Sequence, residues 1–460
     1  MTDKNDASVR HELNMLEGSL WDKILIYAFP LAATGILQQL FNAADIAVVG
    51  RFTGSMASVC MAAVGANTPI VGLIVNLFVG ISMGSNVVVA TAAGRGDEEL
   101  LRKTAGNSLV VALLGGVLMA VIGELTAVPL LQSQNVPAEV LPLAAVYLRI
   151  YFAGMPVILL YNFAAAVYRG IGNTKTPLAA LTISGILNVF LNLFFVIVFG
   201  MNVDGVAIAT VISNAVSAVF LFAGLCRKNG TVAVRMQDLR PDGRTLIRIM
   251  RIGIPTGIQM AVFAVANMII QSAINSLGTI VMAASSAAYN IEVLAYYILN
   301  SFSQACTTFV GQNNGAGNRR RCRRVLKDCI LEDFIFTLLS IVLILLLGRQ
   351  MLGLFNPDKE IVSTGYMRLL WVFSAFAFSM LYENIAGYLR GFGISLVPSL
   401  LTVIGVCGIR IAWIYTVFQT SRTFPSILSA YPVSMAVTAI MLIIAVLVMK
   451  PSVKKPQTIM

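Results

Sequence analysis

The sequence predicts an all-α integral membrane protein with twelve transmembrane helices, arranged as two six-helix lobes around a central cleft. The first indication is composition, since hydrophobic residues make up 58% of the 460 residues and charged residues only 12%. Such a balance is typical of chains that reside in a bilayer. The second is a series of apolar runs of about 20 residues, each long enough to cross the hydrocarbon core as a helix. The third is an internal repeat.

The apolar runs follow a polar stretch at the N-terminus that does not resemble a cleaved secretory signal. With that tail inside the cell, most of the 32 Lys and Arg residues fall in cytoplasmic loops and tails, as the positive-inside rule requires. The net charge of +11 is then explained by topology and by contact with anionic membrane lipids, and no nucleic-acid partner is expected. Both termini are expected in the cytoplasm. The expected spans are 24–49, 58–90, 104–124, 141–166, 178–200, 205–226, 252–275, 281–310, 329–349, 361–388, 394–419 and 425–449.

The repeat links the stretch "YRGIGNTKTP" after the fourth span to "LRGFGISLVP" after the tenth, so that Arg169 corresponds to Arg390. "AAGRGD" and "NNGAGN" are separated by the same offset along the chain. Because six spans per half is an even number, both halves cross the membrane in the same sense, as in transporters with parallel repeats. The expected organisation is a tail (1–23), a first lobe (24–226), a cytoplasmic linker (227–251), a second lobe (252–449) and a second tail (450–460).

Catalytic and metal chemistry have little support in the sequence. The only histidine is His11, in the polar tail, and the six cysteines form no CxxC pair. Disulfides and zinc are therefore not expected. The spans hold no cluster that could carry catalysis, so the chain is not expected to be an enzyme or to need a cofactor.

One carboxylate lies inside the first span, where a charge costs about 2.5–3.5 kcal/mol even on insertion scales and is therefore a functional candidate. This residue is Asp45, in the stretch "QQLFNAADIAVVGRF". In the fifth span, Asn188 and Asn192 are four residues apart and so project from one helix face. Together the three side chains offer one negative charge and several neutral oxygens, which suit a small hard cation, while a proton could use the carboxylate alone. The two amides could also serve only as hydrogen-bonding contacts between helices.

Three further residues are considered, Pro30 as a hinge and Glu292 and Glu383 as secondary candidates. Pro30 in the first span frees backbone carbonyls and is interpreted either as a functional hinge or as a passive kink. Glu292 lies well inside the eighth span, where a functional role and a helix-packing hydrogen bond are both open. Glu383 precedes Arg390 by seven residues, about 10 Å along a helix, so that pairing with a nearby base is a simpler account than transport. Arg149, Arg368 and Arg410 are the basic residues that fall within spans.

Several stretches in this order and spacing closely resemble the multidrug and toxic compound extrusion (MATE) family of bacterial transporters. They are "PLAATGILQQLFNAADIAVVGRF", "GSNVVVATAAGRGD", "YRGIGNTKTP", "LRGFGISLVP" and "TTFVGQNNGAGN". The resemblance runs from about Leu20 to the end of the twelfth span. It implies a monomeric, multi-pass exporter of the cytoplasmic membrane that ejects organic cations and other amphipathic small molecules in exchange for sodium ions or protons.

The resemblance also implies roles for particular residues. Asp45, Asn188 and Asn192 occupy the positions of the cation site in the amino-terminal lobe, which would bind sodium in a sodium-coupled member, and Pro30 matches the first-span proline. Some members have a second aspartate where this chain has Asn192. NorM-like members carry acids in the seventh and tenth spans, whereas "IPTGIQMAVFAVANMIIQ" has none and the tenth span has only Glu383, shifted toward the cytoplasm. The alternatives are a lipid-linked sugar flippase, expected to line its cleft with arginine for pyrophosphate, and an exporter of one endogenous metabolite.

Overall fold

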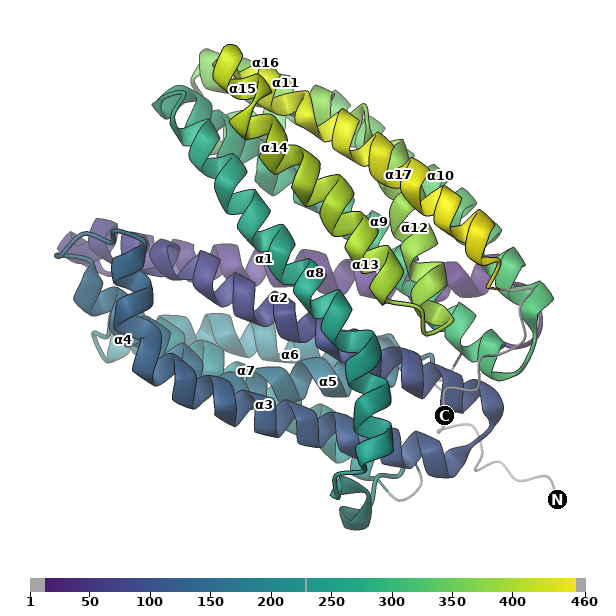
Figure 1. Cartoon of the computed structure of the whole chain (residues 1–460). Helices are drawn as coiled ribbons and strands as arrows, with labels where there is room; N and C mark the ends of the chain where they lie inside the picture. The colour runs from purple at the N-terminus through teal and green to yellow at the C-terminus, as the bar shows by residue number, and fades with distance from the viewer. Residues whose placement is uncertain (1–12, 228–229, 452–460) are drawn as a thin grey trace. The chain divides into compact units, whose positions relative to one another are not determined.

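The computed structural model describes residues 13–227 and 230–451, which form helices and no strands (Figure 1). His11 and most of the two expected tails, 1–23 and 450–460, lie outside these residues. The all-α prediction is confirmed for the described part of the chain. The helices of the first half are α1 (Trp21–Phe52), α2 (Ala57–Arg95), α3 (Glu98–Ser133), α4 (Leu141–Ala153), α5 (Met155–Gly170), α6 (Lys175–Leu193) and α7 (Val203–Cys226).

The second half repeats this order after a linker that holds one short turn, η3 (Met236–Leu239). Its eleventh span is divided by a π-helical segment, η4 (Val403–Gly408), as the fifth ends in another, η2 (Phe194–Val198). The helices of the second half are α8 (Gly243–Asn275), α9 (Thr279–Gly315), α10 (Arg319–Phe355), α11 (Lys359–Phe373), α12 (Phe376–Gly391), α13 (Leu396–Thr402), α14 (Ile409–Tyr415), α15 (Val417–Thr420), α16 (Phe424–Leu428) and α17 (Ala430–Met449).

These helices account for the twelve predicted spans. Over the described ranges, nine helical segments are long and apolar enough to cross a membrane, and two bent pairs, α4 with α5 and α11 with α12, pass the same test together. The remaining predicted span, 281–310, corresponds to α9, a continuous helix of 37 residues. The bends were not predicted, since 141–166 and 361–388 were each expected as one continuous span. They measure 50° and 48°.

The first bend has a local cause. α4 ends before Gly154, and Pro156 in the first turn of α5 cannot donate a backbone hydrogen bond to the turn before it. The second bend falls at Ala375, which is the counterpart of Gly154 at the offset that relates Arg390 to Arg169. The break therefore belongs to the repeat, although only its first copy carries the helix-breaking residues.

The described residues cluster into two compact units. Unit 1 is Ala33–Gly253, and unit 2 is Asn14–Ala32 together with the described residues from Ile254 onward. The boundaries fall inside α1 and α8, so each of these helices supplies residues to both units. The start of α1 thus clusters with unit 2, whereas the expected first lobe, 24–226, included it. The assignment of functional lobes remains a prediction.

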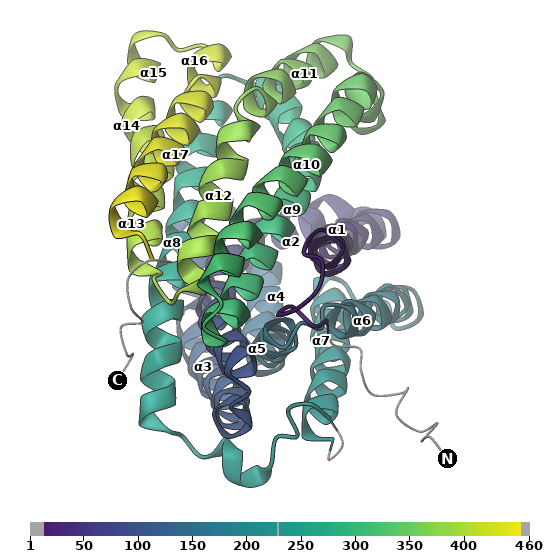
Figure 2. The ribbon, with the colours of Figure 1, turned by 90° about the vertical axis from the view of Figure 1, so that its right-hand side faces the viewer.

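Each unit has its own core around the second part of its bent span. In unit 1, Leu148 of α4 and Leu159 and Phe163 of α5 are fully buried, and α5 packs against α2, α3 and α7. In unit 2, Leu299 of α9 and Leu389 of α12 are fully buried, and α9 packs against α10, α11 and α12 (Figure 2). Since lipid tails are as apolar as leucine, such burial acts mainly through close packing.

Close helix contacts explain why glycines mark the repeat. A Cβ on Gly170 would lie 2.6 Å from Val89 of α2, and a Cβ on Gly391 would lie 2.6 Å from Val310 of α9. The two glycines and the two valines are counterparts at the offset of the repeat. Gly172 and Gly393, which follow the same two helices, have φ of +92° and +78°, where a side chain would be strained. The predicted duplication is thus reproduced in individual contacts.

The linker is attached to unit 1 by polar contacts. The backbone N–H of Asp242 donates to Asn107 Oδ1 of α3 at 2.8 Å, and the Thr245 hydroxyl donates to Asp242 Oδ2 at 2.6 Å. The hydrogen bonds from Thr245 lower the pKa of the Asp242 carboxyl. From Gly243 the chain is helical, so the last residues of the expected linker, 227–251, form the first turns of α8.

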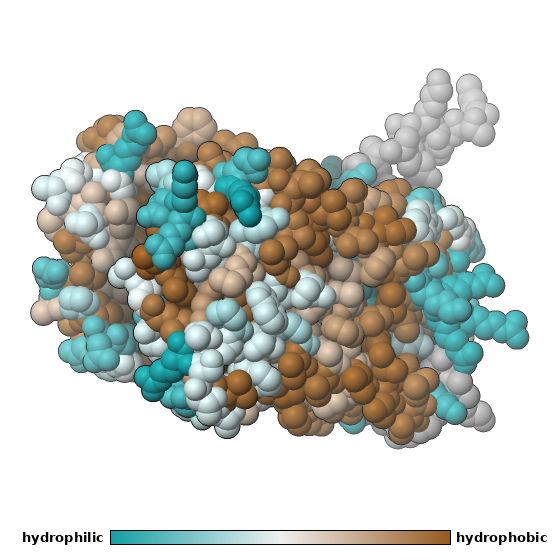
Figure 3. All heavy atoms as spheres, turned by 90° about the horizontal axis from the view of Figure 1, so that it is seen from above, coloured by the Kyte–Doolittle hydropathy of each residue, from teal (hydrophilic) through white to brown (hydrophobic). Residues whose placement is uncertain are grey.

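The outward faces of the helices are apolar. Leu114, Leu118 and Leu125 of α3 are 65%, 57% and 75% exposed, and Leu346 of α10 is 72% exposed. Figure 3 shows broad apolar areas on the face of the molecule turned to the viewer, with hydrophilic residues gathered in smaller patches. Surfaces of this kind suit contact with lipid.

The glycine contacts predict a measurable cost for a single methyl group. Gly391→Ala forces a Cβ against Val310, so we expect the free energy of unfolding to fall by about 1–3 kcal/mol and the midpoint of thermal unfolding of the purified protein to fall with it. Gly353→Ala in α10 is the matched control, because nothing lies within 4 Å of its Cβ and alanine favours a helix. Equal midpoints for both variants would refute the packing account.

The expected topology has a separate test. A reporter enzyme that is active only outside the cytoplasm should be active when fused after Asn202, between α6 and α7, and inactive when fused after Arg235, in the linker. The physical basis is the gathering of basic residues in the linker and in the loops on its side. The opposite pattern of activity would reverse the orientation.

Candidate functional site

The three residues predicted to form a cation site lie together in unit 1. Asp45 on α1 is 8% exposed. Nδ2 of Asn192 donates to Asp45 Oδ1 at 2.6 Å and to Asn188 Oδ1 at 3.2 Å. The structure therefore brings the carboxylate and both amides into one hydrogen-bonded group.

Helix geometry explains this arrangement. Asn188 and Asn192 are one turn apart on α6, so their side chains share a face, and both are buried. α6 packs along α7, which completes the group from the other side. Directly after Leu193 the helix continues as the π-helical segment η2, and π-helical turns are frequent at functional sites.

A fourth polar residue, Thr210 of α7, was missed in the sequence. Its hydroxyl lies 3.5 Å from Asp45 Oδ2 and 2.9 Å from the Val206 carbonyl, and it accepts from Asn188 Nδ2 at 3.3 Å. A threonine that bonds the carbonyl four residues earlier is common in helices. The sequence around Thr210 therefore held no signal for this role.

The group is rich in oxygen and holds one negative charge. Asn192 Oδ1 is buried and, among the described residues, has no hydrogen-bond partner, so a buried acceptor is available beside the carboxylate. Asp45 likewise has no Lys or Arg within 4.0 Å in the described part of the chain. Carboxylate, amide and hydroxyl oxygens are the ligands that hard cations prefer. One charge suits a monovalent ion, and the described residues hold no group of three or more His, Cys, Asp or Glu that could bind a metal.

Two tyrosines of α4, Tyr147 and Tyr151, lie within electrostatic range of the Asp45 carboxylate. Their rings stack with centroids 6.3 Å apart. Both are on the short helix before the bend at Gly154. The same helix also contributes to the core of unit 1, with Tyr147 and Leu148 among its buried residues.

The predicted hinge, Pro30, lies inside α1. The boundary between the two units falls between Ala32 and Ala33, just after this proline. Asp45 follows on the same helix, within unit 1. The position agrees with a hinge, and the hinge itself remains a prediction.

The two secondary candidates are in unit 2, and Glu292 is engaged with an arginine. Glu292 Oε2 accepts from Nη2 of Arg368 at 3.0 Å and from its Nε at 3.2 Å. Glu383 is 5% exposed and interacts electrostatically with Arg390, whose Nη2 donates to Gln259 Oε1 at 3.0 Å. Both carboxylates belong to unit 2, whereas the group around Asp45 is formed by residues of unit 1.

Two buried acids of unit 2 were missed. Glu332 and Asp333 on α10 are both fully buried, although their place at the start of the expected span 329–349 indicated the membrane interface. Asp333 accepts from the Thr337 hydroxyl at 2.7 Å and from Asn384 Nδ2 at 2.6 Å. The two consecutive acids within an apolar stretch were a usable signal.

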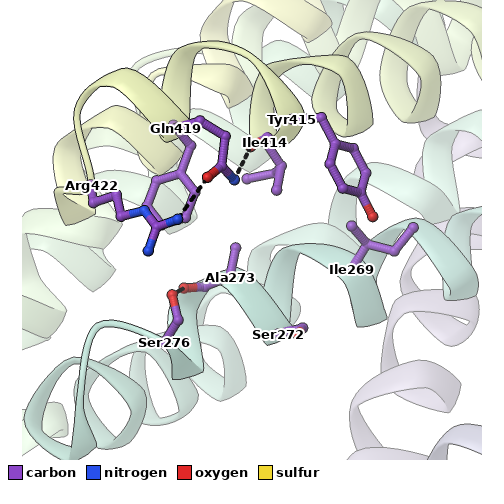
Figure 4. Close-up of a pocket in the computed structure, with 9 residues that line it drawn as sticks. Ile269, Ser272, Ala273, Ser276, Ile414, Tyr415, Gln419 and Arg422 are labelled. Atoms are coloured by element: carbon purple, nitrogen blue, oxygen red, sulfur yellow. Dashed lines mark hydrogen bonds between the residues drawn. The ribbon is translucent and has the colours of Figure 1, made fainter.

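A hollow of about 320 Å³ in unit 2 contains none of the predicted site residues. It lies between α8 and the segment from α14 to Arg422 (Figure 4). At its rim, Arg422 Nη2 donates to Gln419 Oε1 at 2.9 Å. No acid lines the hollow, so it does not resemble a cation site.

Comparison with known proteins identifies the family. The MatE family model matches residues 30–194 and again 255–416, in agreement with the duplication. A Bacillus subtilis (strain 168) protein named for multidrug resistance, YoeA, is 27% identical over 442 residues, covering 92% of this chain and 93% of the relative. A Thermotoga maritima protein also named for multidrug resistance, NorM, is 26% identical over 396 residues, covering 85% and 84%.

A solved structure confirms the fold. It is an outward-facing multidrug resistance MATE transporter of the MOP superfamily, with a TM-score of 0.88 and 23% identity over 96% of this chain and 98% of that one. The bundle of membrane-spanning helices with a buried carboxylate is that of a multi-pass membrane transporter. The chain belongs to the MatE family, which is a family of transporters and not of enzymes.

Thr210 gives a test of the site's composition. We expect Thr210→Val to weaken the apparent affinity for the coupling cation about fivefold, because it removes one oxygen worth roughly 1 kcal/mol. The measurement is the cation dependence of export in vesicles. Thr126→Val is the control, since this exposed hydroxyl donates to the Ile122 carbonyl of its own helix and to no other group in the described part of the chain. An unchanged cation dependence in Thr210→Val would remove Thr210 from the site.

Proposed function

We propose that the protein is a cation-coupled antiporter that exports amphipathic compounds and that Asp45 links the two fluxes. The observation that carries the proposal is a buried carboxylate whose hydrogen-bond partners are neutral, Asn192 and Thr210. The names of the Bacillus and Thermotoga relatives support multidrug export as the physiological class. The coupling ion is sodium or a proton, and the protein needs no other cofactor.

Coupling follows from the hydrogen bonds that the Asp45 carboxylate makes and from its lack of a counter-charge. A buried carboxylate is costly without a counter-charge, and here one oxygen accepts from an amide, while the other has only the distant Thr210 hydroxyl. A cation that binds Asp45 supplies the missing charge and uses Asn192 Oδ1, which has no other partner among the described residues. If the two transport states bind the cation with different affinity, the cation gradient shifts the population between them.

The proposal includes the orientation of the chain in the membrane and its oligomeric state. Both termini lie in the cytoplasm, supported by the distribution of Lys and Arg, and the protein acts as a monomer surrounded by lipid. The exported molecules are amphipathic small molecules. They include cationic drugs or toxic metabolites.

A lipid-linked sugar flippase is a second candidate, favoured by one observation. Arg368 and Arg410 are 3% and 6% exposed in unit 2, and buried arginines suit a pyrophosphate. Against it, Arg368 already pairs with Glu292, which leaves one guanidinium without an acid. Binding of a lipid pyrophosphate to the purified protein would favour the flippase.

Asp45 is the decisive test of the coupling. We expect Asp45→Asn, which keeps shape and hydrogen bonding but removes the charge, to abolish gradient-driven export. The measurement is uphill export in vesicles with sodium and proton gradients imposed independently, which also identifies the coupling ion. Asn192→Asp in the Asp45→Asn background restores a charge next door and should recover part of the export.

The control is Asp204→Asn, also in unit 1. Among the described residues, Asp204 accepts only from the nearby Asn202 N–H at 2.9 Å, so its loss should leave the rate of export unchanged. If Asp45→Asn still drives uphill export at the wild-type rate, the carboxylate is structural. The coupling residue would then be Glu292, Glu383 or Asp333.

A further inference from the structure

Two buried arginines of unit 2 surround a single tyrosine. Cζ of Arg410 lies 4.2 Å from the centroid of the Tyr431 ring, and Cζ of Arg368 lies 5.5 Å from it. The three side chains come from α14, α11 and α17, and none is more than 6% exposed. The cluster was not predicted, although both arginines were noted as lying inside spans.

The charges in this cluster do not balance. Arg368 is satisfied by Glu292 and by Ser285, whose hydroxyl accepts at 2.8 Å. Nε of Arg410 donates to the Ser434 hydroxyl at 2.9 Å. Among the described residues, the two terminal nitrogens of Arg410 have no hydrogen-bond partner, and no acid lies within 4.0 Å of it. Two guanidinium groups and one carboxylate leave one positive charge.

The contacts that Arg410 makes do not compensate for its burial. A neighbouring aromatic ring attracts a cation, but the attraction offsets only part of the cost of taking a guanidinium out of water. Buried arginines are normally paired, with their planar fork bonded to an oxyanion. The four N–H groups on the terminal nitrogens of Arg410 form such a fork, and it is empty of acceptors from the described part of the chain.

The repeat places this cluster where unit 1 holds its candidate cation site. At the offset that relates Arg390 to Arg169, Tyr147 corresponds to Arg368 and Thr210 to Tyr431. Arg410 is one residue after the counterpart of Asn188. Asp45 itself corresponds to Ala266, so the second copy lacks the acid and carries arginines instead. The corresponding regions of the two copies thus carry charges of opposite sign, although at different positions along the repeat.

We propose that unit 2 binds the anionic group of an amphipathic molecule, a carboxylate, phosphate or sulfonate, on the free fork of Arg410 beside Tyr431. Tyr289, whose ring centroid lies 5.8 Å from Cζ of Arg368, is 46% exposed, so the Arg368 side of the cluster lies near the surface of unit 2. The inference rests on the proposed function only in treating the bound molecule as cargo. Anionic or zwitterionic compounds then belong to the exported class, together with the cationic ones.

The test uses two fluorescent probes that differ in one group, 1-anilinonaphthalene-8-sulfonate and its uncharged parent N-phenyl-1-naphthylamine. Binding of each is measured to the full-length protein in phosphatidylcholine nanodiscs, with empty nanodiscs subtracted. We expect Arg410→Gln to weaken binding of the sulfonate about tenfold or more and to leave the neutral probe within twofold. Arg410→Lys, which keeps the charge but loses the fork, should lie between. Arg422→Gln, a loss of charge at the rim of the hollow in Figure 4, should change neither.

A second variant is expected to strengthen binding of the sulfonate, so this test does not depend on a loss of binding. Glu292→Gln removes the only acid that the described residues place in the cluster, so the sulfonate should bind several-fold more tightly while the neutral probe is unaffected. The proposal is overturned if wild-type protein binds both probes equally, if Arg410→Gln weakens both equally, or if Glu292→Gln does not strengthen binding of the sulfonate.

Two further measurements are added. One identifies the source of the anion, and the other separates this proposal from the proposed coupling. If phosphatidylglycerol in the nanodisc competes with the sulfonate in wild type but not in Arg410→Gln, the natural anion is a lipid headgroup. If it does not compete, the anion is a free solute, and either result upholds an anion site. Asp45→Asn should leave sulfonate binding unchanged, because no gradient is involved, so failure of the coupling proposal would not be mistaken for failure of this one.

Discussion

Every charge buried in this helix bundle must be neutralised from within the protein or by something that it binds. The charges that are paired internally, such as Glu292 with Arg368, are satisfied by the fold alone. Asp45 in unit 1 and Arg410 in unit 2, one negative and one positive, have no such partner among the described residues. Since burial of an unpaired charge is costly, both positions point to a ligand of opposite sign.

Duplication explains how one fold came to hold both. The two halves share their bent spans, their glycine contacts and the turns after them, because these features determine how helices pack. Several polar and charged residues on the corresponding helices differ between the halves. One copy holds an acid with amides, and the other holds arginines with a tyrosine. The two copies thus have chemically different sites within equivalent frameworks.

Sequence reasoning predicted what periodicity and spacing encode. The all-helical fold and the repeat followed from apolar runs and a constant offset, and the four-residue spacing placed Asn188 and Asn192 on one helix face. That Asp45 would join them was implied by the resemblance to the MATE family. The bend at Ala375 could not be predicted from its own residues, because nothing there breaks a helix. Thr210 was missed since a threonine in an apolar helix usually bonds its own backbone, and the pairing of Arg368 depends on which helices are neighbours.

Direct binding of the cation tests the central claim without any transport step. A ligand that binds only the folded protein raises its thermal midpoint with concentration, so the midpoint can be followed against sodium at fixed pH and against pH at fixed sodium. Whichever cation stabilises the wild type, its effect should disappear in Asp45→Asn and persist in Asp333→Asn, which removes another buried carboxylate. Persistence of the effect in Asp45→Asn, or its loss only in Asp333→Asn, would contradict the assignment of the cation site to unit 1.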